Sequence, residues 1–145
     1  MGRYDNVEKR MSQNNYAEDQ FKNLLEFNKI PYHHIGFQKS YKEEEWYLLN
    51  KYLKKIPDFI AFIDSIPKFY EVKAATDTFL LKTYAHKIVG RWQVQHPVVY
   101  TILQKGHEFL YIDWDVMDKI SKNYQEKKVL DVMGKEISMD ELRSL

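Results

Sequence analysis

PDFIAFIDSIPKFYEVK, residues 57–73, contains two apolar runs separated by a short break. The runs Asp58–Asp64 and Lys68–Ala75 have the length of β-strands, and Ser65–Pro67 between them has the length of a hairpin loop. Runs this apolar are typical of central strands that are covered on both faces. The stretch therefore predicts a β-hairpin near the middle of a sheet.

Three chemically active side chains are predicted at one end of this hairpin. Asp58 opens the first strand, and Glu71 and Lys73 lie two residues apart on the second, so their side chains share a face. A short hairpin brings the start of one strand beside the end of the other. We therefore expect the two carboxylates and the ammonium to meet at one edge of the sheet.

This combination of groups suits the hydrolysis of a phosphodiester. Mg²⁺ takes oxygen ligands from one or two carboxylates and completes its shell with water and phosphate oxygens. Asp58 and Glu71 are the expected ligands, with the Val72 carbonyl as a further one, and Mn²⁺ is expected to substitute. Such an ion lowers the pKa of an attacking water, while Lys73 orients that water or neutralises the charge on the phosphate. The sequence therefore predicts a small metal-dependent nuclease.

The rest of the chain alternates between helical and strand patterns. The predicted helices cover Asn14 or Asn15 to Asn28, Tyr41–Lys55, Thr78–Gln93, Asp115–Lys127 and a short last helix after the capping box Ser138–Glu141. The other predicted strands are Tyr32–Gln38, Pro97–Leu103 and Glu108–Trp114. This order predicts an α/β fold with a mixed central sheet flanked by helices.

Length and composition indicate one soluble domain over residues 1–145, with residues 1–13 expected to be loose and 129–145 to form a C-terminal extension. No apolar stretch approaches the ~20 residues that span a bilayer, and the N-terminus lacks the apolar segment of a signal peptide. There are no cysteines, which excludes disulfides and thiolate zinc sites and is compatible with the cytoplasm. The net charge of +1 favours no class of partner.

The hairpin residues resemble the PD-(D/E)XK nuclease superfamily, with Pro57-Asp58 as the PD and Glu71-Val72-Lys73 as the ExK. The resemblance covers about residues 16–103 and implies a restriction-endonuclease-like core of order α–β–β–β–α–β. Tyr41–Lys55 is then a helical insertion after the first strand. In this superfamily Asp58 and Glu71 would bind metal, and Lys73 would assist catalysis.

The resemblance also implies an acidic residue on the first helix. Glu18 shares a stripe with Phe21 and Leu25 at the edge of the apolar face, whereas Asp19 lies on a solvated face. Glu18 is therefore the expected fourth residue of the site and a further metal ligand.

Basic residues follow the motif at helical spacing. Lys87 and Arg91 lie four residues apart, and Lys82 precedes them. They either follow the phosphate backbone of a nucleic acid or form an ordinary solvated helix face. His86 and His96 have no partner at the spacing of zinc ligands, and His33 and His34 point to opposite faces of a strand.

The expected activity is a Mg²⁺-dependent endonuclease acting on DNA. Small members of the superfamily include Holliday-junction resolvases and phage or mobile-element nucleases, which favours cleavage of branched DNA by a homodimer. A restriction-type enzyme that cuts a short duplex sequence is the first alternative. The second is a non-catalytic binding or assembly module that kept the fold. The presence of all three residues Asp58, Glu71 and Lys73 argues against this alternative.

Overall fold

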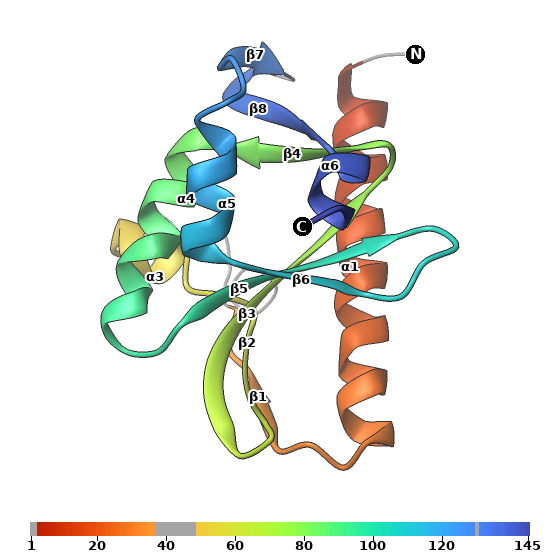
Figure 1. The fold of residues 1–145 in the computed structure, drawn as a ribbon, viewed down its shortest axis with the longest axis vertical. Helices are drawn as coiled ribbons and strands as arrows, with labels where there is room; N and C mark the ends of the chain where they lie inside the picture. The colour runs from red at the N-terminus through yellow and green to blue at the C-terminus, as the bar shows by residue number, and fades with distance from the viewer. Residues whose placement is uncertain (1–2, 37–48, 130) are drawn as a thin grey trace.

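The computed structural model describes residues 3–36, 49–129 and 131–145. Its central sheet has five strands, with β3 in the middle (Figure 1). β3 runs parallel to β5, and the other neighbouring strands are antiparallel. The order across the sheet is β1 (Tyr32–His34), β2 (Phe59–Ile63), β3 (Ile66–Ala75), β5 (Val98–Gln104) and β6 (Leu110–Asp113). The predicted mixed central sheet is confirmed.

A second, antiparallel sheet has the order β4 (Thr78–Lys82), β8 (Val132–Ser138) and β7 (Lys127–Val129). β4 follows β3 after two residues, so the chain passes directly from the central sheet into the small one (Figure 1). A Cβ at Gly134 of β8 would lie 2.9 Å from the Leu81 carbonyl oxygen, so the close approach of β4 and β8 requires glycine there.

The long helix α1 (Arg3–Phe27) covers one face of the central sheet. Ala17, Phe21 and Leu25 are fully buried, as their spacing predicts, and the Phe21 ring lies 5.3 Å from that of Phe59. The predicted start at Asn14 or Asn15, after a loose segment 1–13, is wrong because the helix begins at Arg3. No glycine or proline interrupts residues 3–15, so helical structure can propagate through the polar residues.

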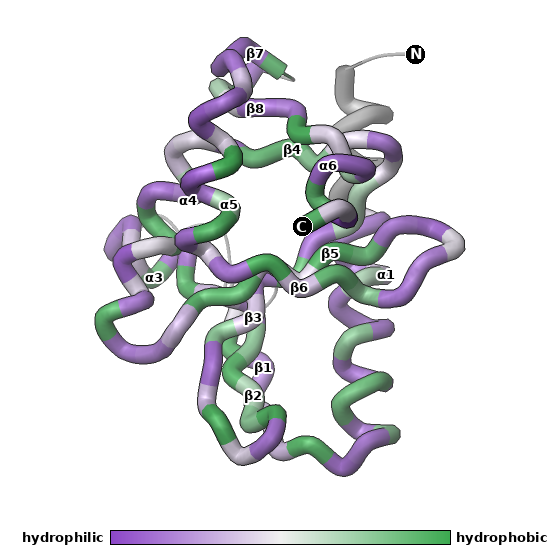
Figure 2. Tube along the Cα trace, in the orientation of Figure 1, coloured by the Kyte–Doolittle hydropathy of each residue, from purple (hydrophilic) through white to green (hydrophobic). Residues whose placement is uncertain are grey.

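The other face of the central sheet shares a core with the small sheet and the remaining helices. Phe69, Tyr100 and Ile102 contribute to this core from the central sheet. The helical segments of this part are α3 (Lys51–Lys54), α4 (Thr83–Gly90), the 3-10 helix η1 (Arg91–Val94), α5 (Trp114–Ser121) and α6 (Met139–Arg143). Figure 2 shows hydrophobic residues gathered on the central strands and, in the coloured part of α1, alternating with hydrophilic ones.

The central hairpin is confirmed, but its turn has two residues and begins one residue before the predicted loop Ser65–Pro67. Phe59 pairs with Tyr70 and Ile63 with Ile66, so the turn is Asp64–Ser65. Both turn residues have positive φ, 54° and 62°, as a two-residue type I′ turn requires. The turn keeps the start of β2 beside the later part of β3.

The predicted helix Thr78–Gln93 is wrong in its first part, because Thr78–Lys82 forms β4. Phe79 and Leu81 are buried at alternate positions, and this strand periodicity is satisfied only through pairing with β8. Asp77 does not cap a helix here; its backbone oxygen accepts a hydrogen bond from Met139 at 3.0 Å. Tertiary pairing has overridden a weak local helix preference.

One prediction for the last third also needs correction. Helix α5 is preceded by Asp113 rather than Asp115, and it ends at Ser121 instead of near Lys127. In the predicted C-terminal extension 129–145, β8 joins the small sheet, and Ile137, Met139 and Leu142 are buried. The predicted cap is confirmed, because the Ser138 side chain accepts a hydrogen bond from the Glu141 amide at 3.3 Å.

The region between the first two strands is described only in part. β1 ends at His34, earlier than the predicted end at Gln38, which lies outside the described residues. Of the predicted helix Tyr41–Lys55, the structure describes α3, and residues 41–48 lie outside the described ranges. None of the described helices combines the length and apolar character needed to cross a membrane.

Candidate functional site

Part of β3 extends beyond the start of β2 and has an open edge. The pairing with β2 ends at Tyr70, so later amides of β3 on that side have no strand partner among the residues that the structure describes. The Asp58 Oδ2 atom accepts a hydrogen bond from the Val72 amide at 2.8 Å, and Asn14 Oδ1 accepts one from the Ala74 amide at 2.9 Å. Two side chains thus replace the missing strand.

Asp58 is itself held in place by the chain after β1. Its backbone oxygen accepts hydrogen bonds from the amides of Ile35 at 2.8 Å and Gly36 at 3.3 Å. A Cβ at Gly36 would lie 3.5 Å from Asp58 Oδ1, so the backbone there approaches the carboxylate closely. The Asp58 side chain therefore has little freedom to leave the edge of β3.

The structure brings Glu71 together with the other predicted site residues. Burial raises the pKa of the Glu71 carboxyl well above its usual range, and the charge of Asp58 raises it further. The charge of Glu18 acts in the same direction, while the charge of Lys73 opposes them. The residue keeps some exposed surface, although its carboxyl group is enclosed by protein atoms.

The donor atoms at this edge fit a hard divalent cation. Two carboxylates, those of Asp58 and Glu71, lie beside each other. The Val72 amide points to the open edge, and since the N–H and C=O of one strand residue point the same way, its carbonyl does too. Within the described ranges no three His, Asp or Glu side chains form a complete metal cluster. Mg²⁺ does not need one, because it keeps several waters.

A second lysine lies near Lys73 and was missed by the sequence analysis. Burial lowers the pKa of Lys55, the charge of Lys73 lowers it further, and Glu71 raises it. Lys55 follows α3 and precedes the Pro57-Asp58 pair by two residues. Its position in a Lys54-Lys55 pair gave no periodic signal, so only the fold shows that it lies near Lys73 and Glu71.

Glu18 is held by a histidine from β1. The His34 Nε2 atom lies 3.2 Å from Glu18 Oε1, and the Glu18 side chain is only 13% exposed. The His34 ring stacks on Phe59, with centroids 4.4 Å apart. Helix α1 thus presents Glu18 toward the start of β2, where Asp58 lies.

The predicted nucleic-acid contacts are not all brought together. Lys87 on α4 and Arg91 on η1 line one pocket, together with Lys122 and Lys135. Lys82 is the last residue of β4 and does not line this pocket. Lys122 and Lys135, far along the sequence from the motif, were not identified from the sequence.

A buried polar chain runs from Glu71 toward this pocket. Tyr100 pairs with Glu71 across β5 and β3, and its hydroxyl lies 2.6 Å from His86 Nδ1. His86 Nε2 lies 3.0 Å from Asp118 Oδ1. Burial, followed by the charges of Glu71 and Asp118, raises the pKa of Tyr100 well above its usual range, and burial lowers that of His86.

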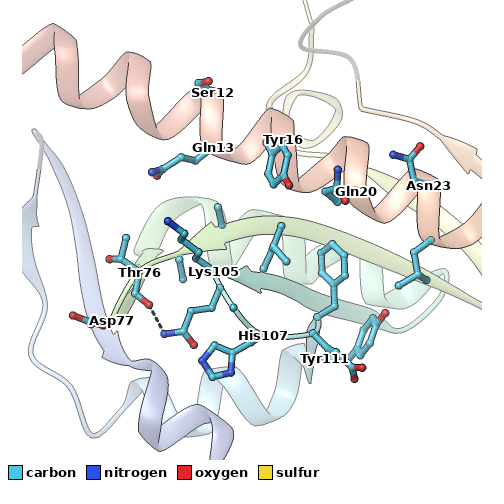
Figure 3. Close-up of a pocket in the computed structure, with 18 of the residues that line it drawn as sticks. Ser12, Gln13, Tyr16, Gln20, Asn23, Thr76, Asp77, Lys105, His107 and Tyr111 are labelled. Atoms are coloured by element: carbon cyan, nitrogen blue, oxygen red, sulfur yellow. Dashed lines mark hydrogen bonds between the residues drawn. The ribbon is translucent and has the colours of Figure 1, made fainter.

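A larger groove of about 1370 Å³ separates α1 from the β5–β6 hairpin (Figure 3). Tyr16 and Gln20 line the groove from the helix, and His107 and Tyr111 line it from the opposite side. The groove contains none of the predicted site residues. It is therefore distinct from the edge of β3 at which Asp58 and Glu71 meet.

No protein-family model matches the chain, and no curated protein matches it. Among solved structures, the chain is similar to Hjc, a Holliday junction resolvase from the archaeal hyperthermophile Archaeoglobus fulgidus. The TM-score is 0.48 and the sequence identity is 9%; the match covers 85% of this chain and 94% of that one.

Proposed function

We propose that this chain is a metal-dependent endonuclease that hydrolyses DNA phosphodiester bonds. The observation that supports this most is the convergence of Asp58, Glu71 and Lys73 at the open edge of β3. Paired carboxylates beside an ammonium suit a reaction in which negative charge accumulates on a phosphate. The PD-(D/E)XK pattern of the same residues agrees with this chemistry.

Asp58 and Glu71 would hold Mg²⁺ or Mn²⁺, with the Val72 carbonyl and Glu18 as further oxygen donors. When bound, the ion would supply a water of lowered pKa and would stabilise charge on the phosphate. The crowding of carboxylates around Glu71 supports this role, because a divalent cation offsets their mutual repulsion.

The remaining residues would orient and neutralise the reacting groups. Lys73 would orient the attacking water or neutralise the phosphate, and Lys55 would add a second positive charge beside it. His34 would keep Glu18 directed at the site through their contact of 3.2 Å. Lys82, Lys87 and Arg91 would contact the DNA backbone.

Branched DNA is the favoured substrate, cut by a homodimer so that two strands are cleaved together. This preference rests on the superfamily resemblance of the motif. One alternative is an enzyme that cuts a short duplex sequence, and the other is a non-catalytic nucleic-acid-binding or assembly module that kept the fold.

A cleavage assay would test the proposal. Wild-type protein is incubated with a fixed four-way junction, a linear duplex or a single strand, with Mg²⁺, Mn²⁺ or EDTA. Glu71→Ala is the test variant, and Glu108→Ala, in an exposed loop far along the chain, is the matched control. We expect metal-dependent cutting by the wild type and the control, and none by Glu71→Ala.

Cutting by Glu71→Ala at the wild-type rate would contradict the metal site. Absence of cutting by folded wild type on all three substrates would favour the non-catalytic module. Preference for the junction over the duplex would support structure-selective cleavage, and the reverse preference would support the restriction-type alternative.

A further inference from the structure

A compact basic pocket of about 510 Å³ lies between α4 and α5 and is closed at one side by β8. Thr83, Lys87 and Arg91 follow one another at intervals of four residues and so share a face of α4 and its continuation. Lys122, just after α5, and Lys135 on β8 complete the basic wall. Three elements far apart in the sequence therefore bring four cations to one cavity.

Positive charge dominates the pocket. Among the described residues that line the pocket, the four cationic side chains are accompanied by one carboxylate, that of Asp118. This carboxylate is already engaged, because it lies 3.0 Å from His86 Nε2 and 3.8 Å from Lys122 Nζ. Lys87 and Arg91 have no ion-pair partner among the described residues. An anion in the pocket would relieve the repulsion among these cations.

The pocket wall is built from constrained groups. Lys135 Nζ donates a hydrogen bond to the Ser121 carbonyl at 2.7 Å, which ties β8 to the end of α5. Trp114 stacks on His86 at 4.4 Å and donates a hydrogen bond to its backbone oxygen at 2.9 Å. Within the described part of the chain, the Thr83 hydroxyl is buried without a hydrogen-bond partner. A pocket wall with an unsatisfied hydroxyl and a tethered lysine, Lys135, suits an oxygen-rich ligand.

The pocket is linked to the candidate nuclease site through the protein interior. His86 lines the pocket and contacts the Tyr100 hydroxyl, while Tyr100 lies opposite Glu71 in the sheet. Two buried side chains therefore connect the wall of the pocket with the candidate site.

We propose that the basic pocket between α4, α5 and β8 binds a phosphate group of the polynucleotide that occupies the candidate site. Arg91 supplies a planar fork that matches phosphate oxygens, and Lys87, Lys122 and Lys135 supply point charges. The identification of DNA as the carrier of this phosphate rests on the proposed function. The pocket then positions the strand, whereas Asp58 and Glu71 act on the bond that is cut.

The test measures DNA binding in EDTA, so that cleavage plays no part. The affinity of a labelled four-way junction is followed by fluorescence anisotropy as inorganic phosphate or chloride is added at equal ionic strength. The test protein is the double variant Lys87→Gln/Lys122→Gln, whose substituted side chains are exposed. Lys119→Gln is the matched control, because Lys119 is exposed on α5 but does not line the pocket. Circular dichroism checks that each variant is folded.

We expect phosphate to weaken DNA binding more than chloride does in the wild type and in Lys119→Gln. This additional weakening by phosphate should disappear in the double variant. The slope of the logarithm of the DNA-binding constant against the logarithm of the salt concentration should also fall by about one unit per lost contact. Equal competition by phosphate and chloride in the wild type would overturn the proposal. Binding of inorganic phosphate to the pocket can be followed by NMR shifts of the amides on α4 and α5. If phosphate binds there but leaves the affinity for DNA unchanged, the proposal is also overturned, because the pocket would then bind free phosphate.

The two proposals fail separately. A wild-type protein that cleaves DNA but shows no specific phosphate effect contradicts the pocket alone. A wild-type protein that shows the phosphate effect but cleaves no substrate contradicts the nuclease assignment and supports the pocket as part of a binding module.

Discussion

The Asp58 carboxylate accepts a hydrogen bond from the Val72 amide at 2.8 Å while it also lies beside Glu71. One side chain therefore satisfies a backbone group that β2 leaves unpaired and contributes charge to the candidate site. The hydrogen bond and the proposed metal binding would use oxygens of the same carboxylate, and different substitutions can separate the two.

Asp58→Asn should abolish metal-dependent cleavage while it preserves most of the stability, because an amide oxygen can still accept the Val72 hydrogen bond. Asp58→Ala should abolish cleavage and lower the free energy of unfolding by about 1–2 kcal/mol, since the buried amide loses its partner. Urea denaturation of both variants measures the difference. Equal free energies of unfolding for Asp58→Asn and Asp58→Ala would show that the hydrogen bond from the Val72 amide contributes little to stability.

Glu71→Gln should remove the stabilisation of the protein by divalent metal. In EDTA this variant should be at least as stable as the wild type, because a neutral amide avoids burial of charge beside Asp58. Mg²⁺ or Mn²⁺ should raise the Tm of the wild type and of the control Glu108→Gln, but not that of Glu71→Gln. A metal-dependent rise in Tm that persists in Glu71→Gln would place the cation elsewhere.

Lys73→Ala should slow cleavage more than it weakens metal binding. Loss of one preorganised charge at the reacting phosphate typically costs about 10²–10³ in rate. Single-turnover cleavage gives the rate, and calorimetric titration with Mn²⁺ gives the affinity. If the variant instead loses Mn²⁺ binding, Lys73 does not act on the reacting groups in the way proposed.

Glu18→Gln should reduce cleavage, whereas Asp19→Asn, on the next residue of α1, should leave it unchanged. Glu18 is mostly covered and contacts His34, while Asp19 is exposed. His34→Ala should produce a milder loss, because it removes a group that orients Glu18 without removing the carboxylate. Equal effects of the Glu18 and Asp19 substitutions would exclude a specific role for Glu18.

The stability of the wild type should fall as the pH drops below about 6.5, the ordinary pKa of histidine. Burial lowers the pKa of His86 in the folded chain, so below this pH the unfolded chain binds more protons than the folded one. The titratable groups that face His86 are Tyr100, Asp118 and Lys135. Of these, Asp118 raises the pKa of His86 and so opposes the effect of burial.

Thermal denaturation between pH 5.5 and 7.5 measures this effect. His86→Gln should show a flatter dependence of Tm on pH, and His107→Gln, at an exposed loop position, should behave like the wild type. A His86→Gln variant with the same pH dependence as the wild type would assign the effect to another group.

Much of the candidate site could be anticipated from local pattern. Asp58, Glu71 and Lys73 lie on one hairpin, so their convergence follows from strand periodicity and a short turn. Glu18 required the superfamily resemblance of the motif, which implies an acidic residue on the first helix, and the identification of the apolar face of α1. Lys55 and His34 could not be found in this way, because their proximity to the site depends on how separate elements pack.

The same distinction holds for the fold. The sequence by itself determined the buried face of α1, the β2–β3 hairpin and β5, since each carries its own periodicity or continuous apolar run. Only the tertiary structure decided that Thr78–Lys82 is a strand, that β8 belongs to the core, and that Lys87, Arg91, Lys122 and Lys135 share a pocket. Those outcomes depend on partners far along the chain, and the free energy of such contacts exceeds the weak local preferences that a single segment expresses.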